Sequence, residues 1–219
     1  MDALLLLTWA RGTGLNLALT ILALGVIWRL IEVYGLGRKP DLSAPRSVAG
    51  ASGWHTIVRR SVPPPGMLKT SPITYIGGYI FHIGLLIVVI LFAPHIKTIE
   101  ALLGVAWRAL PSQVVDFVTV ISTAAMIVVL IDRLLKPAKR YLSTFADWFA
   151  WTVTFLPLIT GWLAVHHLLL PYTLMLALHV LSVELLLICI PFTKLFHAFA
   201  TFGSRWFIGA VNGHKGVPI

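Results

Sequence analysis

The sequence predicts an all-α membrane protein that crosses the bilayer five times as one helical bundle, and three observations carry this prediction. Of the 219 residues, 58% are hydrophobic and 11% are charged, whereas soluble domains hold about 45–50% apolar and about 25% charged residues. The mean hydropathy is +0.90. The apolar residues gather in five runs, each close to the ~20 residues that a helix needs to cross a bilayer. We expect one domain over residues 1–219.

The five predicted spans are separated by segments that break helices. They cover approximately residues 13–35, 74–94, 114–133, 147–168 and 173–193. The stretch SVPPPGM precedes the second span, Pro111 precedes the third, Pro137 follows it, and Pro171 lies between the fourth and the fifth. Proline lacks a backbone N–H and clashes with the preceding helical turn, so it favours these boundaries.

The basic residues between the spans predict the orientation of the bundle. Cytoplasmic loops are enriched in Lys and Arg, and here thirteen such residues fall on one side and two, Lys97 and Arg108, on the other. We therefore expect an outside N-terminus and a cytoplasmic C-terminus in the inner (plasma) membrane of a bacterium. The thirteen are Arg38, Lys39, Arg46, Arg59, Arg60, Lys69, Arg133, Lys136, Lys139, Arg140, Lys194, Arg205 and Lys215.

Membrane topology also accounts for the net charge of +9, so we expect lipid and no nucleic acid as a partner. The N-terminal stretch lacks a basic region and a small-residue cleavage site, and we expect it to be retained. Cys189 is the single cysteine and lies in an apolar run. No cysteine-ligated cluster can be built from this chain alone, so an iron–sulfur centre or a flavin would belong to a partner.

Histidines in or beside the spans fall into two layers, one at each predicted membrane face. The cytoplasmic layer holds His82 and His197, and the outer layer holds His95, His166, His167 and His179. An ionisable residue at membrane depth marks a functional site by default. The simpler use of such a histidine is a hydrogen bond to a serine or a carbonyl across helices.

The spacing of His179 and His197 favours two cofactors stacked across the membrane. On a helix that continues past the fifth span, 18 residues are five whole turns, which places both rings on one face roughly 27 Å apart. The second span runs antiparallel to the fifth, so His82 can face His197 and a second outer histidine can face His179. Haem iron bound between paired imidazoles would satisfy one nitrogen of each ring, and the porphyrin would supply apolar surface.

Two stretches resemble the membrane cytochrome b (gamma) subunit of respiratory nitrate reductases and its relatives in sulfur-metabolising complexes. They are FHIG, at Phe81–Gly84, and HVLSVELLLICIPFTKLFHAF, at His179–Phe199. The resemblance implies five spans, an outside N-terminus and two b haems with ligands from the second and fifth spans. It implies that His82 and His197 bind the haem nearer the cytoplasm, and that His179 binds the outer haem.

The sequence departs from this family at the fourth ligand. The family's ligand lies ten residues after the FHIG histidine, where this chain has Phe92. His95 comes three residues later, about 4.5 Å along a helix and about 60° around it from the expected site, and Pro94 can bend the helix end to compensate. His95 is thus one candidate partner of His179. His166 or His167, a five-coordinate outer haem, and a single-haem protein are the alternatives.

The resemblance also implies a function in electron transfer. It predicts the haem b subunit of an oxidoreductase complex that exchanges electrons between the quinone pool and iron–sulfur and catalytic partner subunits on the cytoplasmic side. Candidate contacts to the quinone head group are Lys97, His95 and His166. Two other functions remain open, namely a haem-poor anchor for a soluble oxidoreductase and a small transporter.

Overall fold

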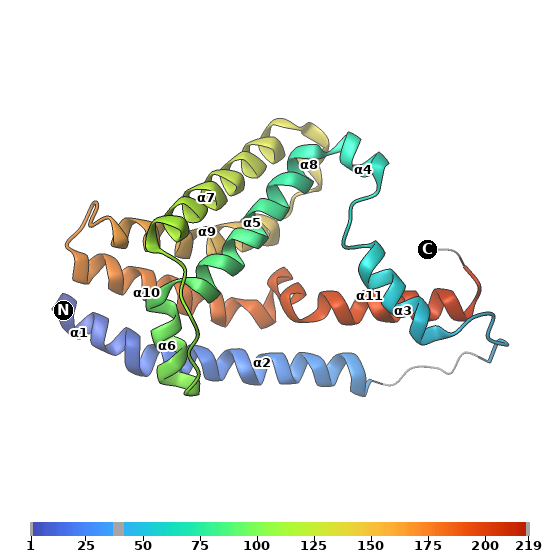
Figure 1. Cartoon of the computed structure of the whole chain (residues 1–219), viewed down its shortest axis with the longest axis horizontal. Helices are drawn as coiled ribbons and strands as arrows, with labels where there is room; N and C mark the ends of the chain where they lie inside the picture. Colours follow the sequence, from blue (N-terminus) through green and yellow to red (C-terminus); the bar gives the residue numbers. More distant parts are fainter. Residues whose placement is uncertain (1, 37–41, 218–219) are drawn as a thin grey trace.

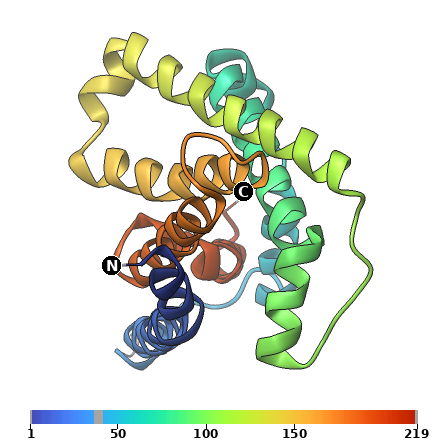
Figure 2. The ribbon, with the colours of Figure 1, turned by 90° about the vertical axis from the view of Figure 1, so that its left-hand side faces the viewer.

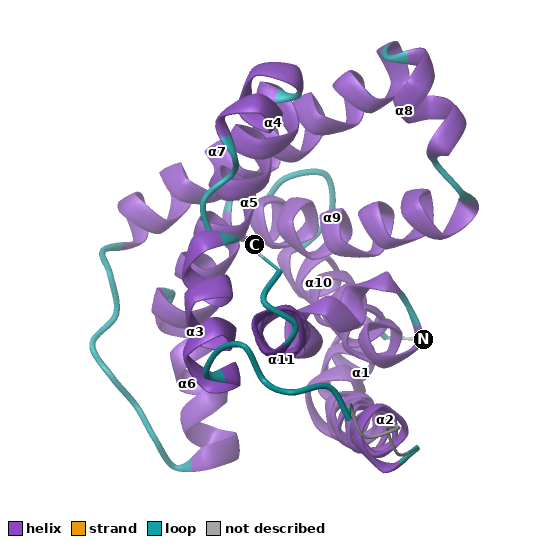
Figure 3. Cartoon of the chain, turned by 90° about the vertical axis from the view of Figure 1, so that its right-hand side faces the viewer, coloured by secondary structure: helices purple, strands orange, loops and turns teal. Residues whose placement is uncertain are grey.

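The computed structural model describes residues 2–36 and 42–217, and every regular element within these ranges is a helix (Figure 1 and Figure 3). Arg38 and Lys39, counted above for the orientation, lie outside the described residues. The elements are α1 (Ala3–Trp9), η1 (Ala10–Gly14), α2 (Leu15–Gly35), α3 (Ala49–Arg59), α4 (Pro65–Thr70), α5 (Pro72–Leu91), α6 (Ala93–Leu103), α7 (Ser112–Leu135), α8 (Pro137–Leu142), α9 (Phe145–Val165), α10 (Tyr172–Cys189), η2 (Ile190–Phe192), η3 (Lys194–Phe196) and α11 (His197–His214).

Among the described residues, five helical stretches are long and apolar enough to cross a membrane, which confirms the predicted number. They are Ala3–Gly35, Pro72–Leu91, Ser112–Leu135, Phe145–Val165 and Tyr172–Phe192. Figure 1 places the N-terminus and the α9–α10 connection at the left end, α8 and α4 at the top, and α3 and the end of α11 toward the right. The described basic segments therefore lie at the ends of the spans opposite the N-terminus.

The first stretch begins ten residues earlier than predicted. The Asp2 side chain accepts a hydrogen bond from the Leu4 backbone N–H at 3.2 Å and caps the start of α1, as a helix N-terminus requires. Helical structure continues through the π-helical turn η1 into α2. Leu7 and Ala10 are buried, and α1, η1 and α2 all pack along α10.

Close packing of α5 on α7 depends on two glycines of the second span. A Cβ atom at Gly84 would lie 1.8 Å from Ser122 Oγ, and one at Gly77 would lie 2.6 Å from Val129 Cγ2. Gly78 lies one turn before His82, and a Cβ there would meet nothing within 4 Å. Gly77 and Gly84 therefore serve contact between helices, while the open surface beside His82 is at Gly78.

We predict that Gly84→Ala destabilises the protein by about 1–3 kcal/mol, the usual cost of overpacking. Ser122 is fully buried and its short side chain has no flexible end to move aside. Thermal unfolding in detergent measures the effect, and Ser122→Gly in the same chain should restore most of the loss, because contacting sites are coupled. Gly50→Ala is the matched control, since a Cβ at Gly50, unlike one at Gly84, meets nothing within 4 Å. Equal unfolding temperatures for the two alanine variants would contradict the packing argument.

The fifth span does not continue as one helix to His197, so that expectation is wrong. Pro191 interrupts the backbone hydrogen bonding, and the chain passes through two 3₁₀ turns, η2 and η3, separated by the extended residue Thr193. Pro191 is buried against Gly25 of α2. His197 is the first residue of α11. Its placement relative to His179 therefore comes from this turn and not from five regular helical turns.

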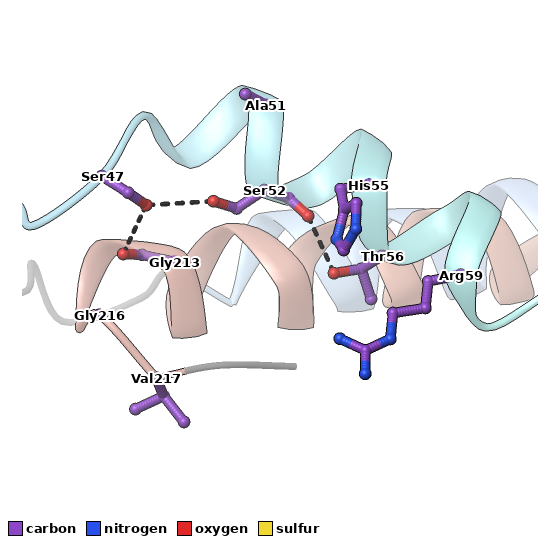
Figure 4. A pocket seen from close by; sticks show the side chains of 9 residues that line it. All are labelled: Ser47, Ala51, Ser52, His55, Thr56, Arg59, Gly213, Gly216 and Val217. Carbon is purple, nitrogen blue, oxygen red and sulfur yellow. Dashed lines mark hydrogen bonds between the residues drawn. The ribbon is translucent and has the colours of Figure 1, made fainter. Parts of the chain in front are cut away.

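Beyond the break, α11 packs along α3. Ser47 Oγ, just before α3, donates to the Gly213 carbonyl of α11 at 2.7 Å, while Thr56 Oγ1 donates to the Ser52 carbonyl at 2.8 Å within α3 (Figure 4). Between α3 and the end of α11 lies an open pocket whose lining includes His55 and Arg59. None of the predicted ligand histidines lines it.

Candidate functional site

The structure brings His82 and His197 together across α5 and the start of α11. Their ring centroids are 6.1 Å apart and their planes meet at 70°. His82 Nδ1 lies 2.7 Å from the Gly78 carbonyl, one turn earlier in α5, and His197 Nδ1 lies 2.8 Å from the Lys194 carbonyl. A carbonyl only accepts hydrogen bonds, so each Nδ1 carries the proton. In the neutral rings the lone pair is then on Nε2, the atom free to bind a ligand.

His95 and His179 form a second pair between α6 and α10. Their ring centroids are 6.2 Å apart and their planes meet at 18°. His95 Nδ1 lies 2.9 Å from the Val88 carbonyl, and His179 Nδ1 lies 3.3 Å from Thr160 Oγ1. Thr160 Oγ1 is 2.6 Å from the Leu156 carbonyl and donates to it, so it accepts from His179. Both rings of this pair are thus also held through Nδ1.

His179 fits a notch that Gly161 leaves in α9. A Cβ atom at Gly161 would lie 2.9 Å from His179 Cε1, so any larger residue would displace the ring. The hydroxyl of Ser182 donates to the His179 carbonyl at 2.7 Å and lies 3.0 Å from Thr160 Oγ1. Side chains of α9 and α10 together therefore fix the position of this imidazole.

A break between α5 and α6 directs the His95 ring back toward the span. Phe92 is extended, and α6 starts at Ala93 with Pro94 in its first turn. The last carbonyls of α5 lose their helical partners at this break. The Leu91 carbonyl accepts from Leu110 N at 3.0 Å, and the Ile90 carbonyl accepts from Trp107 Nε1 at 2.7 Å. The Val88 carbonyl accepts from His95, which fixes the ring.

Phe92, ten residues after His82, packs its ring edge-to-face on His95 at 5.3 Å. Burial lowers the pKa of His95, although backbone hydrogen bonds at Val88 and Val89 act in the opposite direction. At neutral pH the imidazole is therefore neutral, which is the state that binds a metal ion.

Both pairs have the spacing that a metal ion between two imidazoles requires. A bond from a metal to an imidazole nitrogen is about 2 Å long, and the ring centre lies about 1.1 Å beyond that nitrogen, so opposed ligands place their centroids about 6 Å apart. Among the described residues, no group of three or more His, Cys, Asp or Glu side chains is placed to hold a metal. Two imidazoles are the protein ligands that a bis-histidine haem requires, and the spacing of the two pairs fits that group.

Each pair takes one ring from α5–α6 and the other from α10–α11. In the described part of the chain, α5 packs along α7, while α10 packs along α9, α1 and α2. Figure 2 shows α5 and α7 on one side of the molecule and the first span on the other, with α10 between them. His82 is exposed within an apolar stretch, where a polar ring left uncovered in lipid is costly. A flat apolar group would cover it.

His166 and His167 contact residues other than His179. His166 Nε2 lies 2.7 Å from Asp116 Oδ1 of α7, and its ring packs on Trp162. His167 has a positive φ of 55° and stacks on Tyr172. The contacts of these two rings in the described residues are therefore structural and do not include His179.

The three predicted quinone contacts do not form one cluster. His95 is held against Val88 and faces His179. Lys97, two residues later in α6, is exposed. His166 is engaged with Asp116. Only His95 and Lys97 share an element, α6.

Glu184, a buried carboxyl in the fifth span, faces the first span. Its side chain lies against Gly14, where a Cβ atom would come within 2.8 Å of Oε1. Glu184 is 5% exposed, and its Oε1 has no hydrogen-bond partner among the described residues. Five residues separate it from His179, which places the two about 140° apart around the helix.

Sequence reasoning missed two carboxylates that form ion pairs, Asp132 and Asp147. Asp132 is buried and binds Lys136 Nζ at 2.7 Å as well as Lys139 Nζ. Asp147 binds Lys194 Nζ at 2.8 Å. The pattern Thr-x-x-Asp before an apolar run is typical of a helix N-terminal capping box, so Thr144 and Asp147 could have been found from the sequence. The partner lysine could not.

No protein-family model and no solved structure matches the chain. A protein of Nitratidesulfovibrio vulgaris (strain Hildenborough), described only as "Protein", is 34% identical over 187 residues, which are 84% of this chain and 79% of the relative. The chain belongs to the same family as this protein. Because the match extends over most of both chains, the relationship with the N. vulgaris protein concerns the bundle as a whole.

Proposed function

We propose that the protein is the haem b subunit of a bacterial membrane oxidoreductase complex. In this proposal it transfers electrons between the quinone pool and an iron–sulfur partner on the cytoplasmic side. The observation that carries the proposal is the pairing of four histidines into two sites, each with a ring-centroid separation near 6 Å. The resemblance of Phe81–Gly84 and His179–Phe199 to nitrate reductase gamma subunits supports the same function.

The chain's own residues would bind and orient the two haems. His82 and His197 would hold the haem nearer the cytoplasm, and His95 and His179 the haem nearer the outside. Haem supplies one-electron chemistry, while the protein sets the axial ligands, the spacing and the surrounding dielectric. Hydrogen bonds from Nδ1 to Gly78, Lys194, Val88 and Thr160 keep the rings in the required tautomer and raise their basicity as ligands.

Quinone would bind near the outer haem, where Lys97, two residues after His95 on α6, offers an exposed cation. The basic segments at the ends of the spans opposite the N-terminus support a cytoplasmic C-terminus in the inner membrane. The same side carries α3 and α11, where the partner subunit would dock. A haem-poor anchor and a small transporter are the alternatives, and both predict a protein without bound haem.

Haem content tests the proposal directly. The protein is purified from membranes of cells supplied with haem, and a pyridine haemochrome assay measures haem b per chain. We expect two haems, both reduced by a short-chain quinol in a reduced-minus-oxidised spectrum. A colourless protein would overturn the proposal and leave the anchor or transporter. If dithionite reduces the haem but quinol does not, the haem part of the proposal stands and the quinone part is wrong.

A further inference from the structure

Asp147 is the centre of a network that joins three elements next to His197. Its Oδ2 accepts hydrogen bonds from the Thr144 backbone N–H at 2.9 Å and from Thr144 Oγ1 at 2.8 Å, which completes the capping box of α9. Its Oδ1 binds Lys194 Nζ at 2.8 Å and lies 3.7 Å from Arg133 Nη1 at the end of α7. One carboxylate thus connects α7, α9 and η3.

Lys194 carries this connection to the histidine through its backbone. Its side chain is held by Asp147, and its carbonyl accepts the hydrogen bond from His197 Nδ1 at 2.8 Å. The η3 turn that contains it is short and follows the extended Thr193, whose hydroxyl caps the turn by accepting from Leu195 N at 3.2 Å. A 3₁₀ turn of three residues has few restraints of its own. Besides the burial of Phe196 in the same turn, the Asp147–Lys194 contact restrains the residue whose carbonyl orients His197.

We propose that Asp147 is a positioning residue that fixes, through Lys194, the orientation of the His197 imidazole as a haem ligand. This inference rests on the proposed function. The hydrogen bond to the second ring nitrogen controls both the ring plane and the basicity of a ligating histidine. Loss of the restraint should therefore change the properties of the haem nearer the cytoplasm and leave those of the outer haem unchanged. Because Lys194 is more than half exposed, the pair contributes little to global stability.

The test uses the full-length protein with its haems and two complementary variants. Asp147→Asn weakens both the ion pair and the capping box, whereas Lys194→Gln removes only the ion pair and keeps the Lys194 carbonyl. Redox titration of each haem and the EPR signal of the ferric protein are measured. We expect both variants to retain two haems, and the potential and EPR signal of one haem to shift in the same sense. Lys194→Arg should preserve the wild-type values.

Asp116→Asn is the matched control, since it removes another carboxylate paired to a side chain on a different helix, His166, and should leave the haem nearer the cytoplasm unchanged. Wild-type potentials in Lys194→Gln, with one haem lost in His197→Ala, would overturn the positioning role alone. Equal shifts of both haems in Lys194→Gln would also overturn it. A His197→Ala variant that keeps both haems would instead overturn the ligand assignment on which the inference depends.

Discussion

His197→Ala is expected to halve the haem content if the proposed function holds, from two b haems per chain to one, and His82→Ala is expected to do the same. The two rings belong to one pair, with centroids 6.1 Å apart, and they lie on elements that do not pack along one another in the described part of the chain. Removal of either imidazole would leave only one histidine of this pair to hold the haem. A pyridine haemochrome assay on purified protein measures the loss.

The double variant His82→Ala/His197→Ala decides whether the two rings serve one site. Substitutions at two residues of one site do not have additive effects. The double variant should therefore retain the same single haem as either single variant. His55→Ala is the control, because His55 lies on α3 at the open pocket beside α11, and it should retain both haems. Loss of both haems in the double variant would assign His82 and His197 to different sites.

His95→Ala is expected to remove the other haem, while His166→Ala and His167→Ala retain it. The His95 ring lies 6.2 Å from that of His179, whereas His166 is bound to Asp116 and His167 stacks on Tyr172. The haemochrome assay and the EPR spectrum of the ferric protein distinguish these outcomes. The remaining signal in His95→Ala should be the one that His197→Ala abolishes. Full haem content in His95→Ala, with loss in His166→Ala, would assign the fourth ligand to His166, which follows α9.

The sequence predicts the spans well because hydrocarbon places a simple demand on them. Each span needs about 20 apolar residues, so the number of spans follows from hydropathy, and proline marks most of their ends. The start of the first span is the exception, because the residues before Gly14 are apolar enough to continue the helix. A run of leucines is compatible with either an exposed end or a longer helix, and contact with α10 decides between them.

The placement of the histidines was harder to predict because it depends on breaks in helices. The sequence shows Pro94 and Pro191, but their effect on the path of the chain depends on which carbonyls find new partners. The Val88 carbonyl accepts from His95, seven residues later, and this hydrogen bond across the break turns the ring toward His179. The same reasoning fails for His166, since its partner Asp116 is fifty residues away in the chain.

Each histidine pair takes one ring from α5–α6 and the other from α10–α11, and this division has a consequence for assembly. The α5–α7 and α9–α10 hairpins can each form from neighbouring segments of chain, but neither contains a complete pair. Porphyrins bound at both pairs would hold α5–α6 and α10–α11 together. Membrane insertion would then precede cofactor delivery. Protein made without haem should be cut by proteases in the segments that connect the α5–α7 hairpin to the α9–α10 hairpin.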